Sequence, residues 1–482
     1  MKRNLFSKAF IAMTATAVMG LASCSSDNDP AGGQVEQGKA TEMSLVFDLS
    51  GANTRAITDN NATEGEKKIT NLDVYIYNEN GILEKFYELD WKKDLQEVQG
   101  QPNVYTTKTG YTATTGQKTI LVGANLTENM KTLLKGTTAN GLMAKGANAT
   151  IADLTKGQDG FVMFSTKAAE PKLVELTTNK DDVENYPAAN KVEVKLQRLS
   201  AKVAVGMSKQ LNEPNVQQGV AGVITDLGFL VDNTNKMFYM RQLNDDFTGV
   251  KDANLTKAQY NEDHFEFKGD YSILANTDYK AIAPGTAYIQ ANGGNWGVDY
   301  GSENVTTDKE MKGVTRVVVK GKFTPGSGIK VTGTGGVGDP YVFTNTADHI
   351  TDGATYYVLN LPQIGGYAFF NETDGADDMK IKAFLMQEGK MDDNTATEAL
   401  KKKEKYTNGL NYWWVTVKDN QGDMLRNHYY KVDITSIWAP GRPDGKFNPD
   451  KDDKPIDKET NITVKVTVEE WKMVDFTADL RP

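Results

Sequence analysis

The sequence contains a single cysteine, Cys24, in 482 residues. Because a disulfide needs two cysteines, no disulfide within the chain can stabilise the fold, and its stability has to come from packing. A cysteine-rich metal site is excluded for the same reason. Cys24 also lies in an N-terminal segment where it has another use, described below, so we exclude a cysteine nucleophile.

Histidine is nearly as scarce, with His264, His349 and His428 only. None of them lies in a metal-ligand spacing such as H-E-x-x-H, and no G-x-S-x-G motif indicates a serine nucleophile. The glycines of 333–338 have the G-x-G-x-x-G spacing, but more strand follows them where a dinucleotide site needs a helix, so a hairpin loop is favoured. The acidic run 450–453 lacks the spacing of an EF-hand loop. We therefore expect no catalytic residues, no metal and no cofactor, and we do not expect an enzyme.

The chain also lacks an excess of positive charge and a long apolar run in its interior. Its formal net charge is -10, which argues against a nucleic-acid partner because a basic surface supplies most of that affinity. After the N-terminus, no segment approaches the roughly 18 apolar residues of a transmembrane helix.

The N-terminus carries the pattern of an export signal. Lys2, Arg3 and Lys8 precede a short apolar run over 9–22, and the sequence Leu-Ala-Ser-Cys ends at Cys24. This ending resembles the bacterial lipobox, in which the cysteine is lipidated and becomes the mature N-terminus. Residues 1–23 are thus predicted to be a lipoprotein signal peptide, and Cys24 the lipidation site that anchors the precursor in a membrane. The acidic residues of 25–29 resemble a surface-export signal, and a solvated linker is the alternative.

The first strand is predicted over 43–49, after a polar tether. Met43, Leu45, Phe47 and Leu49 fall on one face at period two, whereas Ser44 and Asp48 fall on the other. A polar loop that contains Arg55 follows this strand. The pattern predicts a half-buried strand followed by an exposed loop.

Beyond this loop, the chain reads as short strands separated by turns. A hairpin is predicted around the turn 78–81, and helices are predicted over 128–135 and 394–406, whereas 380–386 reads as a strand. The strand pattern changes phase near Arg198, with almost no linker. We expect an all-β fold with few short helices, in which a β-sandwich domain over 56–198 is followed by a second, larger one over 199–482.

The last segment repeats the pattern of the first strand, with Val474, Phe476, Ala478 and Leu480 on one face. Both segments therefore offer four apolar side chains at the same spacing. If a trypsin-like protease cut after Arg55, the first strand could leave, and the terminal strand of a neighbouring copy could replace it. The alternative is that both strands belong permanently to their own domains.

Several segments resemble the Bacteroidales fimbrillins, and the ending is closest to the minor-fimbrium (Mfa-type) shaft subunit, a type V pilin. The segments that carry this resemblance are the lipobox, the stretch around Arg55, the junction 192–203, the strand 425–434 and the segment 462–471. The resemblance implies two tandem transthyretin-like β-sandwich domains and a structural subunit of an adhesive fimbria. It also implies cleavage by an Arg-specific protease between Arg55 and Ala56, so that residues 24–55 form a removable propeptide. The implied partners are other copies in a homopolymer, in which 474–480 is the donor strand, and accessory and anchor fimbrial subunits.

A surface glycan-binding lipoprotein is the alternative function. It would need an exposed aromatic platform, which the adjacent Tyr412, Trp413 and Trp414, or Trp438, could provide.

Overall fold

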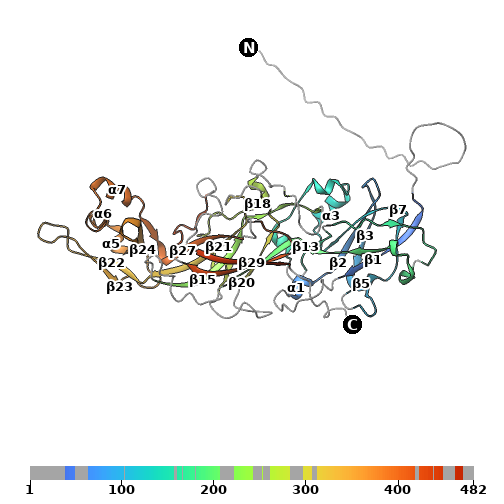
Figure 1. The fold of residues 1–482 in the computed structure, drawn as a ribbon, viewed down its shortest axis with the longest axis horizontal. Helices are drawn as coiled ribbons and strands as arrows, with labels where there is room; N and C mark the ends of the chain where they lie inside the picture. The colour runs from blue at the N-terminus through green and yellow to red at the C-terminus, as the bar shows by residue number, and fades with distance from the viewer. Residues whose placement is uncertain are drawn as a thin grey trace, which may run out of the picture. The chain divides into compact units, whose positions relative to one another are not determined.

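The computed structural model describes about three quarters of the chain, from Gly38 to Glu470 with gaps. The described residues are 38–48, 63–101, 104–156, 160–165, 167–179, 181–206, 222–242, 252, 261–282, 297–306, 312–417, 423–437, 439–448 and 462–470. Those from Lys39 onward belong to one compact unit. In the described part, strands dominate and the helices are short (Figure 1), which confirms the predicted fold class. No helix in these ranges is long and apolar enough to cross a membrane.

The first sandwich consists of two sheets that face each other across a hydrophobic core. One sheet has the order β12 (Lys191–Val194), β1 (Ala40–Asp48), β5 (Val104–Thr107), β4 (Leu95–Glu97), and β6 (Tyr111–Thr114) also pairs with β1. The other sheet has the order β13 (Gln197–Arg198), β10 (Met163–Phe164), β8 (Thr119–Ala124), β2 (Asn71–Tyr77), β3 (Leu83–Asp90). The predicted hairpin is confirmed between β2 and β3, where Gly81 adopts a φ of 72° that suits glycine.

Short helices complete the first sandwich. They are α1 (Glu64–Lys67), α2 (Trp91–Asp94), α3 (Glu128–Lys135) and α4 (Ile151–Leu154). The prediction of α3 is confirmed, and its Met130 and Leu134 bury against Tyr75 and Tyr77 on the outer face of β2. The second sheet is therefore covered on both faces, which explains why nearly all of β2 is buried.

The second sandwich has two four-stranded sheets around its own core. One has the order β20 (Gly297–Ser302), β14 (Ser200–Gly206), β28 (His428–Ile437), β29 (Ile462–Glu470). The other has the order β19 (Lys280–Ala281), β15 (Gly222–Asp232), β21 (Arg316–Pro325), β27 (Leu410–Thr416). Only Leu199 separates β13 of the first sandwich from β14 of the second, so the chain passes between them without a linker.

A third sheet is inserted between β21 and β27. Its order is β23 (Val342–Ala347), β22 (Ser327–Thr332), β25 (Gly366–Asn371), β24 (Tyr356–Leu361), β26 (Glu404–Tyr406). The helices α5 (Glu372–Ala376), α6 (Asp378–Gln387) and α7 (Asp393–Leu400) bury Ile381, Phe384 and Ala396 against one of its faces. We call this unit the inserted sheet.

Two sequence-based assignments in the inserted sheet need correction. The predicted strand over 380–386 is helix α6, which begins where the Asp377 carboxylate accepts hydrogen bonds from the backbone of Met379 and Lys380. Its buried residues, Ile381, Phe384 and Leu385, have helical spacing that a short apolar run does not distinguish from a strand. The predicted helix over 394–406 is α7 followed by β26, so it ends earlier than expected.

Three two-stranded ladders lie outside the larger sheets. They are β7 (Gly116–Gln117) with β11 (Lys172–Leu173), β16 (Thr234–Asn235) with β18 (Phe265–Glu266), and β9 (Gly146–Asn148) with β17 (Met237–Tyr239). The last ladder joins a segment of the first sandwich to a segment that follows β15 of the second.

Candidate functional site

The first strand, β1, lies inside its sheet and not at an edge. It pairs in parallel with β12 on one side and antiparallel with β5 and β6 on the other. Phe47, for example, lies opposite Val194 of β12 and Tyr105 of β5. Removing β1 would therefore expose backbone groups along three strands, β12, β5 and β6.

The core-facing side chains of β1 are fully buried. Met43, Leu45 and Phe47 each have 0% exposure, which confirms the predicted alternation over this part of the strand. Phe47 packs edge-on against Trp91, with ring centroids 5.9 Å apart. Burying three such side chains is worth roughly 5–9 kcal/mol, at about 1.5–3 kcal/mol for each.

The other face of β1 is more buried than the sequence predicts. Ser44 is only 1% exposed, although a solvent-facing position was expected, because β1 is a central strand whose outer face is also covered. Only Glu42 and Val46 are partly exposed among residues 41–47. Leu49, the fourth apolar residue predicted for this strand, lies outside the described residues.

Asn190 holds the start of β1 with its side-chain amide and is itself completely buried. Its Nδ2 donates to the Glu42 carbonyl at 2.7 Å, to the Thr41 hydroxyl at 3.2 Å and to the Val174 carbonyl at 3.0 Å, and its Oδ1 accepts from the Val174 N–H at 3.1 Å. Since a buried polar group without a partner costs about 1–3 kcal/mol, Asn190 needs β1 in place.

A second site lies at the junction of the two sandwiches, around the buried carboxylate of Glu66. The Lys202 ammonium of β14 lies 3.0 Å from Glu66 Oε1, and the Tyr300 hydroxyl of β20 donates to the same oxygen at 2.7 Å. The Arg198 guanidinium donates to the Glu66 carbonyl at 2.9 Å. Burial lowers the pKa of Lys202 and that of Arg198, the latter to about 10, and it raises the pKa of Tyr300. Glu66 of the first sandwich is thus bound by two strands of the second.

Glu66 also caps the N-terminus of the short helix α1. Its carboxylate accepts from the Thr63 N–H at 2.7 Å, while the Thr63 hydroxyl accepts from the Glu66 N–H, which is a capping box. One buried side chain therefore fixes both the helix and the junction.

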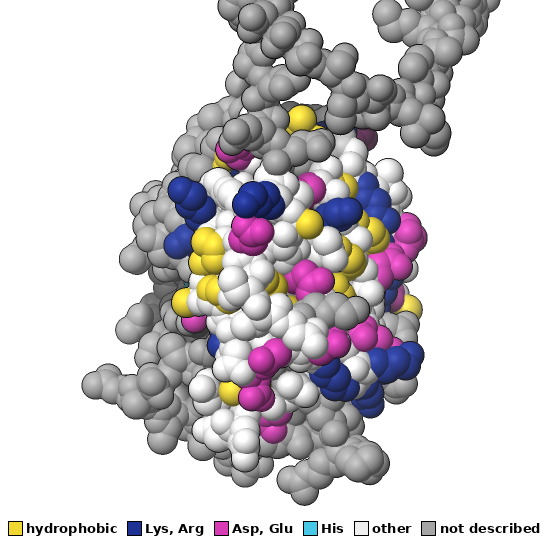
Figure 2. Space-filling view, turned by 90° about the vertical axis from the view of Figure 1, so that its right-hand side faces the viewer, with side chains coloured by type: hydrophobic (Ala, Val, Ile, Leu, Met, Phe, Trp, Pro, Cys, Tyr) yellow, Lys and Arg dark blue, Asp and Glu magenta, His cyan; other side chains and the backbone are white. Residues whose placement is uncertain are grey.

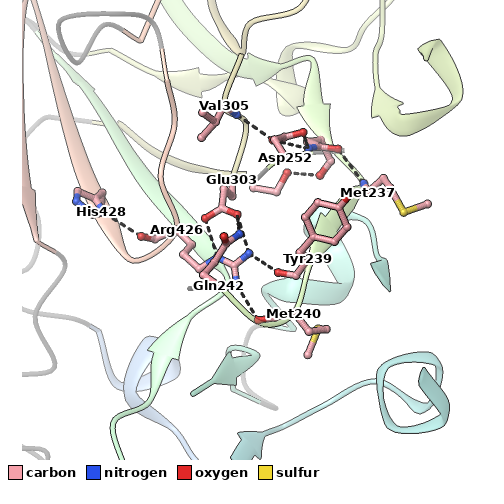
Figure 3. A network of polar contacts seen from close by, with 11 residues as sticks. Met237, Tyr239, Met240, Gln242, Asp252, Glu303, Val305, Arg426 and His428 are labelled. Atoms are coloured by element: carbon pink, nitrogen blue, oxygen red, sulfur yellow. Dashed lines mark hydrogen bonds and ion pairs between the residues drawn. The ribbon is translucent and has the colours of Figure 1, made fainter. Parts of the chain in front are cut away.

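Arg426 forms a second polar cluster at the same junction (Figure 3). Its guanidinium binds Glu303 through two hydrogen bonds of 2.7 Å, and the two side chains are 0% and 1% exposed. Its Nη2 also donates to the Tyr239 carbonyl at 2.7 Å, and Nη1 donates to the Met240 carbonyl at 3.3 Å. Gln242 donates to Glu303 Oε1 at 3.0 Å. The cluster fixes the segment that carries β17.

This segment places two side chains in the core of the first sandwich. Phe238 and Met240, 2% and 0% exposed, pack in the cluster that contains Met130 and Leu134 of α3. Phe238 also pairs with Ala147 in the ladder of β17 and β9. The junction therefore consists of an extended ladder, shared hydrophobic packing and two buried ionic clusters.

The described surface does not favour the alternative function. Trp413 and Trp414 are 2% and 8% exposed, so both are core residues of β27 and cannot form the aromatic platform that a glycan-binding protein needs. Trp438 lies outside the described residues. Figure 2, which views the end where β1, β5 and β7 lie, shows hydrophobic, basic and acidic side chains interspersed. Within the described ranges, no group of three His, Cys, Asp or Glu side chains is arranged to hold a metal.

Most of the other predicted site residues lie outside the described part of the chain. They are Cys24, Arg55, Ala56, Val474, Phe476, Ala478 and Leu480. Their lipidation, cleavage and strand-donor roles remain predictions.

Two family models match this chain. One, described as major fimbrial subunit protein (FimA), matches residues 41–215, from the second residue of β1 through β14. The other, described as the C-terminal part of the type IV major fimbrial subunit protein, fimbrillin, matches residues 404–476. The chain belongs to the fimbrillin family. It is therefore a structural subunit of a cell-surface fimbria and not an enzyme.

Solved structures similar to this fimbrillin include three bacterial proteins. The fimbrilin FimA of Porphyromonas gingivalis W83 is 14% identical, with 90% of this chain and 99% of that chain covered and a TM-score of 0.42. The tip fimbrial protein Mfa3 of Porphyromonas gingivalis, with a C-terminal truncation, is 13% identical, with coverage of 89% and 100% and a TM-score of 0.35. A fimbrial assembly protein of Parabacteroides distasonis is 16% identical, with coverage of 64% and 96% and a TM-score of 0.31. Among curated protein sequences, no match is found.

Sequence reasoning missed the residues of both junction clusters. From the sequence, Arg198 marks only the change in strand pattern, and no pattern identifies Glu66, Lys202, Glu303 or Arg426. The available signal was weak: Lys202 interrupts the otherwise small and apolar run of β14, a position where a charge needs a partner.

Proposed function

We propose that this fimbrillin is made as a surface lipoprotein, is cleaved after Arg55, and polymerises when the terminal strand of a neighbouring copy replaces β1. Cys24 carries the lipid that holds the precursor at the outer membrane. An Arg-specific protease separates residues 24–55 from the mature chain, which begins at Ala56. The mature chain comprises a domain over 56–198 and a domain over 199–482.

The position of β1 is the observation that supports the exchange step most strongly. As an interior strand, β1 pairs with the three strands β12, β5 and β6 and fills the core with Met43, Leu45 and Phe47. A subunit without β1 has a groove that is unfavourable by several kcal/mol, which gives a replacement strand a large driving force. In this proposal, Val474, Phe476, Ala478 and Leu480 of a second copy provide the replacement, because their spacing matches that of the apolar residues of β1.

Because the donor strand and the groove are different surfaces, each copy contributes both. Repetition of such a head-to-tail contact gives an open filament rather than a closed ring. Accessory and anchor subunits would end or attach the filament through the same groove or the same strand.

Arg55→Ala tests the cleavage step. We expect the precursor to stay on the membrane and surface filaments to be lost, whereas Lys68→Ala, which removes an exposed basic side chain directly after helix α1, should leave assembly intact. SDS-resistant oligomer ladders and the intact mass of the surface-extracted chain measure the outcome. Normal ladders from Arg55→Ala would show that cleavage at this residue is not required.

Deletion of residues 474–482 tests the donor role separately. The expected product is a folded, cleaved monomer that starts at Ala56, while deletion of 481–482 alone should still allow polymerisation. Filaments of normal length from the longer deletion would contradict the exchange step without contradicting the cleavage step.

A further inference from the structure

The strand β23, at the edge of the inserted sheet, is exposed along most of its length. Only β22 pairs with it among the described strands, and Figure 1 shows it on the outer side of the β22–β23 hairpin. Val342 is 53% exposed, and Thr344, Asn345 and Ala347 are also exposed. The strand has the sequence Val-Phe-Thr-Asn-Thr-Ala, with high β propensity and without charge or proline.

Edge strands of this kind are unusual because proteins normally protect them from pairing with other chains, often with charged residues. The other described edge strands of five or more residues are protected. Charged residues occur in β3, β20 and β29. The edge strand β27 is uncharged but buried, and its Tyr412 exchanges two backbone hydrogen bonds with Arg442. Of these edges in the described chain, β23 alone is both uncharged and exposed.

The ladder with β22 determines which backbone groups of β23 face outward. The Asp348 N–H donates to the Gly326 carbonyl at 3.2 Å, which places the backbone groups of 348 toward β22. Because successive residues of an antiparallel strand alternate, residues 346, 344 and 342 also face β22. Phe343, Asn345 and Ala347 therefore direct their N–H and C=O groups away from the sheet.

We propose that β23 pairs antiparallel with β23 of a second copy, around a two-fold axis at Asn345. In this register Asn345 lies opposite Asn345 of the other copy, and Phe343 lies opposite Ala347. All three resulting pairs can exchange two hydrogen bonds each, so every outward backbone group of the strand is satisfied. Between them, Thr344 lies opposite Thr346 on the same face of the joined sheet.

The self-complementary register selects a second copy as the occupant, and it brings two acidic chains together without opposing their charges. Two chains that each carry a net charge of -10 repel one another over most of their surfaces. In the proposed register no charged residue lies opposite another, because the first charge, Asp348, falls opposite Val342. A self-complementary contact of this type has the two-fold symmetry that is commonest among homo-oligomers.

Such a contact is too small to hold two free subunits together. It involves six residues of each strand, whereas a stable interface has roughly 20–30 residues on each side. Along a fimbria the contact would be repeated in every subunit, and its strength would grow through multivalency. The contact therefore joins fimbriae side by side. This consequence rests on the proposed polymerisation, whereas the pairing of β23 itself does not rest on it.

Charge substitutions at the two-fold axis test the bundling. In fimbriae sheared from cells that express the full chain, Asn345→Lys should reduce the fraction of laterally paired fimbriae about tenfold or more, because like charges lie directly opposite each other. Asn345→Asp should do the same, and a mixture of the two kinds of fimbria should restore pairing. The control Gln363→Lys adds the same charge at an exposed position of the inserted sheet that is away from this edge. Unchanged pairing in Asn345→Lys, or no recovery in the mixture, would overturn the proposal.

A cross-link tests the β23 contact without depending on filaments. Opposed Cα atoms in such a pair lie about 5.5 Å apart, which a disulfide can span. Full-length Asn345→Cys should form disulfide-linked dimers on mild oxidation at the cell surface, also when Arg55→Ala blocks processing, whereas Gln363→Cys should remain monomeric. Absence of dimers would refute the contact, whereas absence of fimbriae with dimers present would refute only the proposed polymerisation.

Discussion

Substitution of Phe47 distinguishes a removable strand from a permanent one. Phe47→Ala removes a fully buried ring that packs on Trp91 in the core of the first sandwich. Truncation of a buried phenylalanine typically costs about 3–5 kcal/mol, a large part of the stability of most domains. The precursor, which contains β1, should lose this amount. Filaments should be unaffected if the mature chain starts after β1, as proposed.

The matched control is Leu72→Ala on β2, a residue that is also 0% exposed in the same core. Because β2 follows the cleavage site, this change should destabilise both the precursor and the filament. Guanidinium unfolding of the Arg55→Ala precursor measures the first effect. The temperature at which SDS dissociates purified filaments measures the second.

If Phe47→Ala lowers filament stability as much as Leu72→Ala does, β1 remains in the assembled subunit and its replacement by another strand is refuted. If Phe47→Ala does not fold, Phe47→Leu provides the same comparison, because it keeps most of the buried volume and should cost about 1.5 kcal/mol or less.

Three further changes test the buried charges. Burial raises the pKa of Asp73 to about 6, although the Lys131 ammonium lies 3.4 Å from its carboxylate. The folded chain therefore favours the protonated carboxyl, and this contribution to the free energy of unfolding is lost as the pH rises through 6. Asp73→Asn should therefore raise the free energy of unfolding by roughly 1–3 kcal/mol at pH 7.5 and by almost nothing below pH 4, as measured with urea at both pH values. Arg426→Met should cost about 3–5 kcal/mol by leaving Glu303 buried and unpaired, and adding Glu303→Leu should recover most of the loss in melting temperature. Glu66→Ala should cost a similar amount, since it leaves the Lys202 ammonium buried without this carboxylate, and should lower the melting temperature; an unchanged melting temperature would contradict that role.

The sequence predicts the elements whose pattern is local. The alternation of Met43, Leu45 and Phe47 identifies β1 because a strand with one face in a core repeats every two residues. The same pattern gives the wrong exposure for Ser44, since burial of the second face depends on neighbouring segments that are distant in the chain. Similarly, Ile381 and Phe384 fit a short strand or a helix equally well until the capping residue, Asp377, is considered.

The junction could not be predicted because its contacts join residues that are far apart in sequence. Glu66 meets Tyr300, and Arg426 meets Glu303, yet no local pattern relates either pair. A single sequence shows charged residues without showing which are buried. The inserted sheet is equally hard to predict from sequence. Its strand β22 pairs with β25, although β23 and β24 lie between these two strands in the chain.

The position of Phe238 and Met240 determines when the first sandwich can finish folding. Both residues complete a core that otherwise consists of residues 75–199, so this core stays open until the chain has been produced as far as residue 240. Tyr429 packs on the other core of the same sandwich and extends this delay almost to the C-terminus. The first half of the fimbrillin therefore completes its two cores only with residues of the second half, and a chain truncated near the junction would expose apolar surface rather than form an independent half.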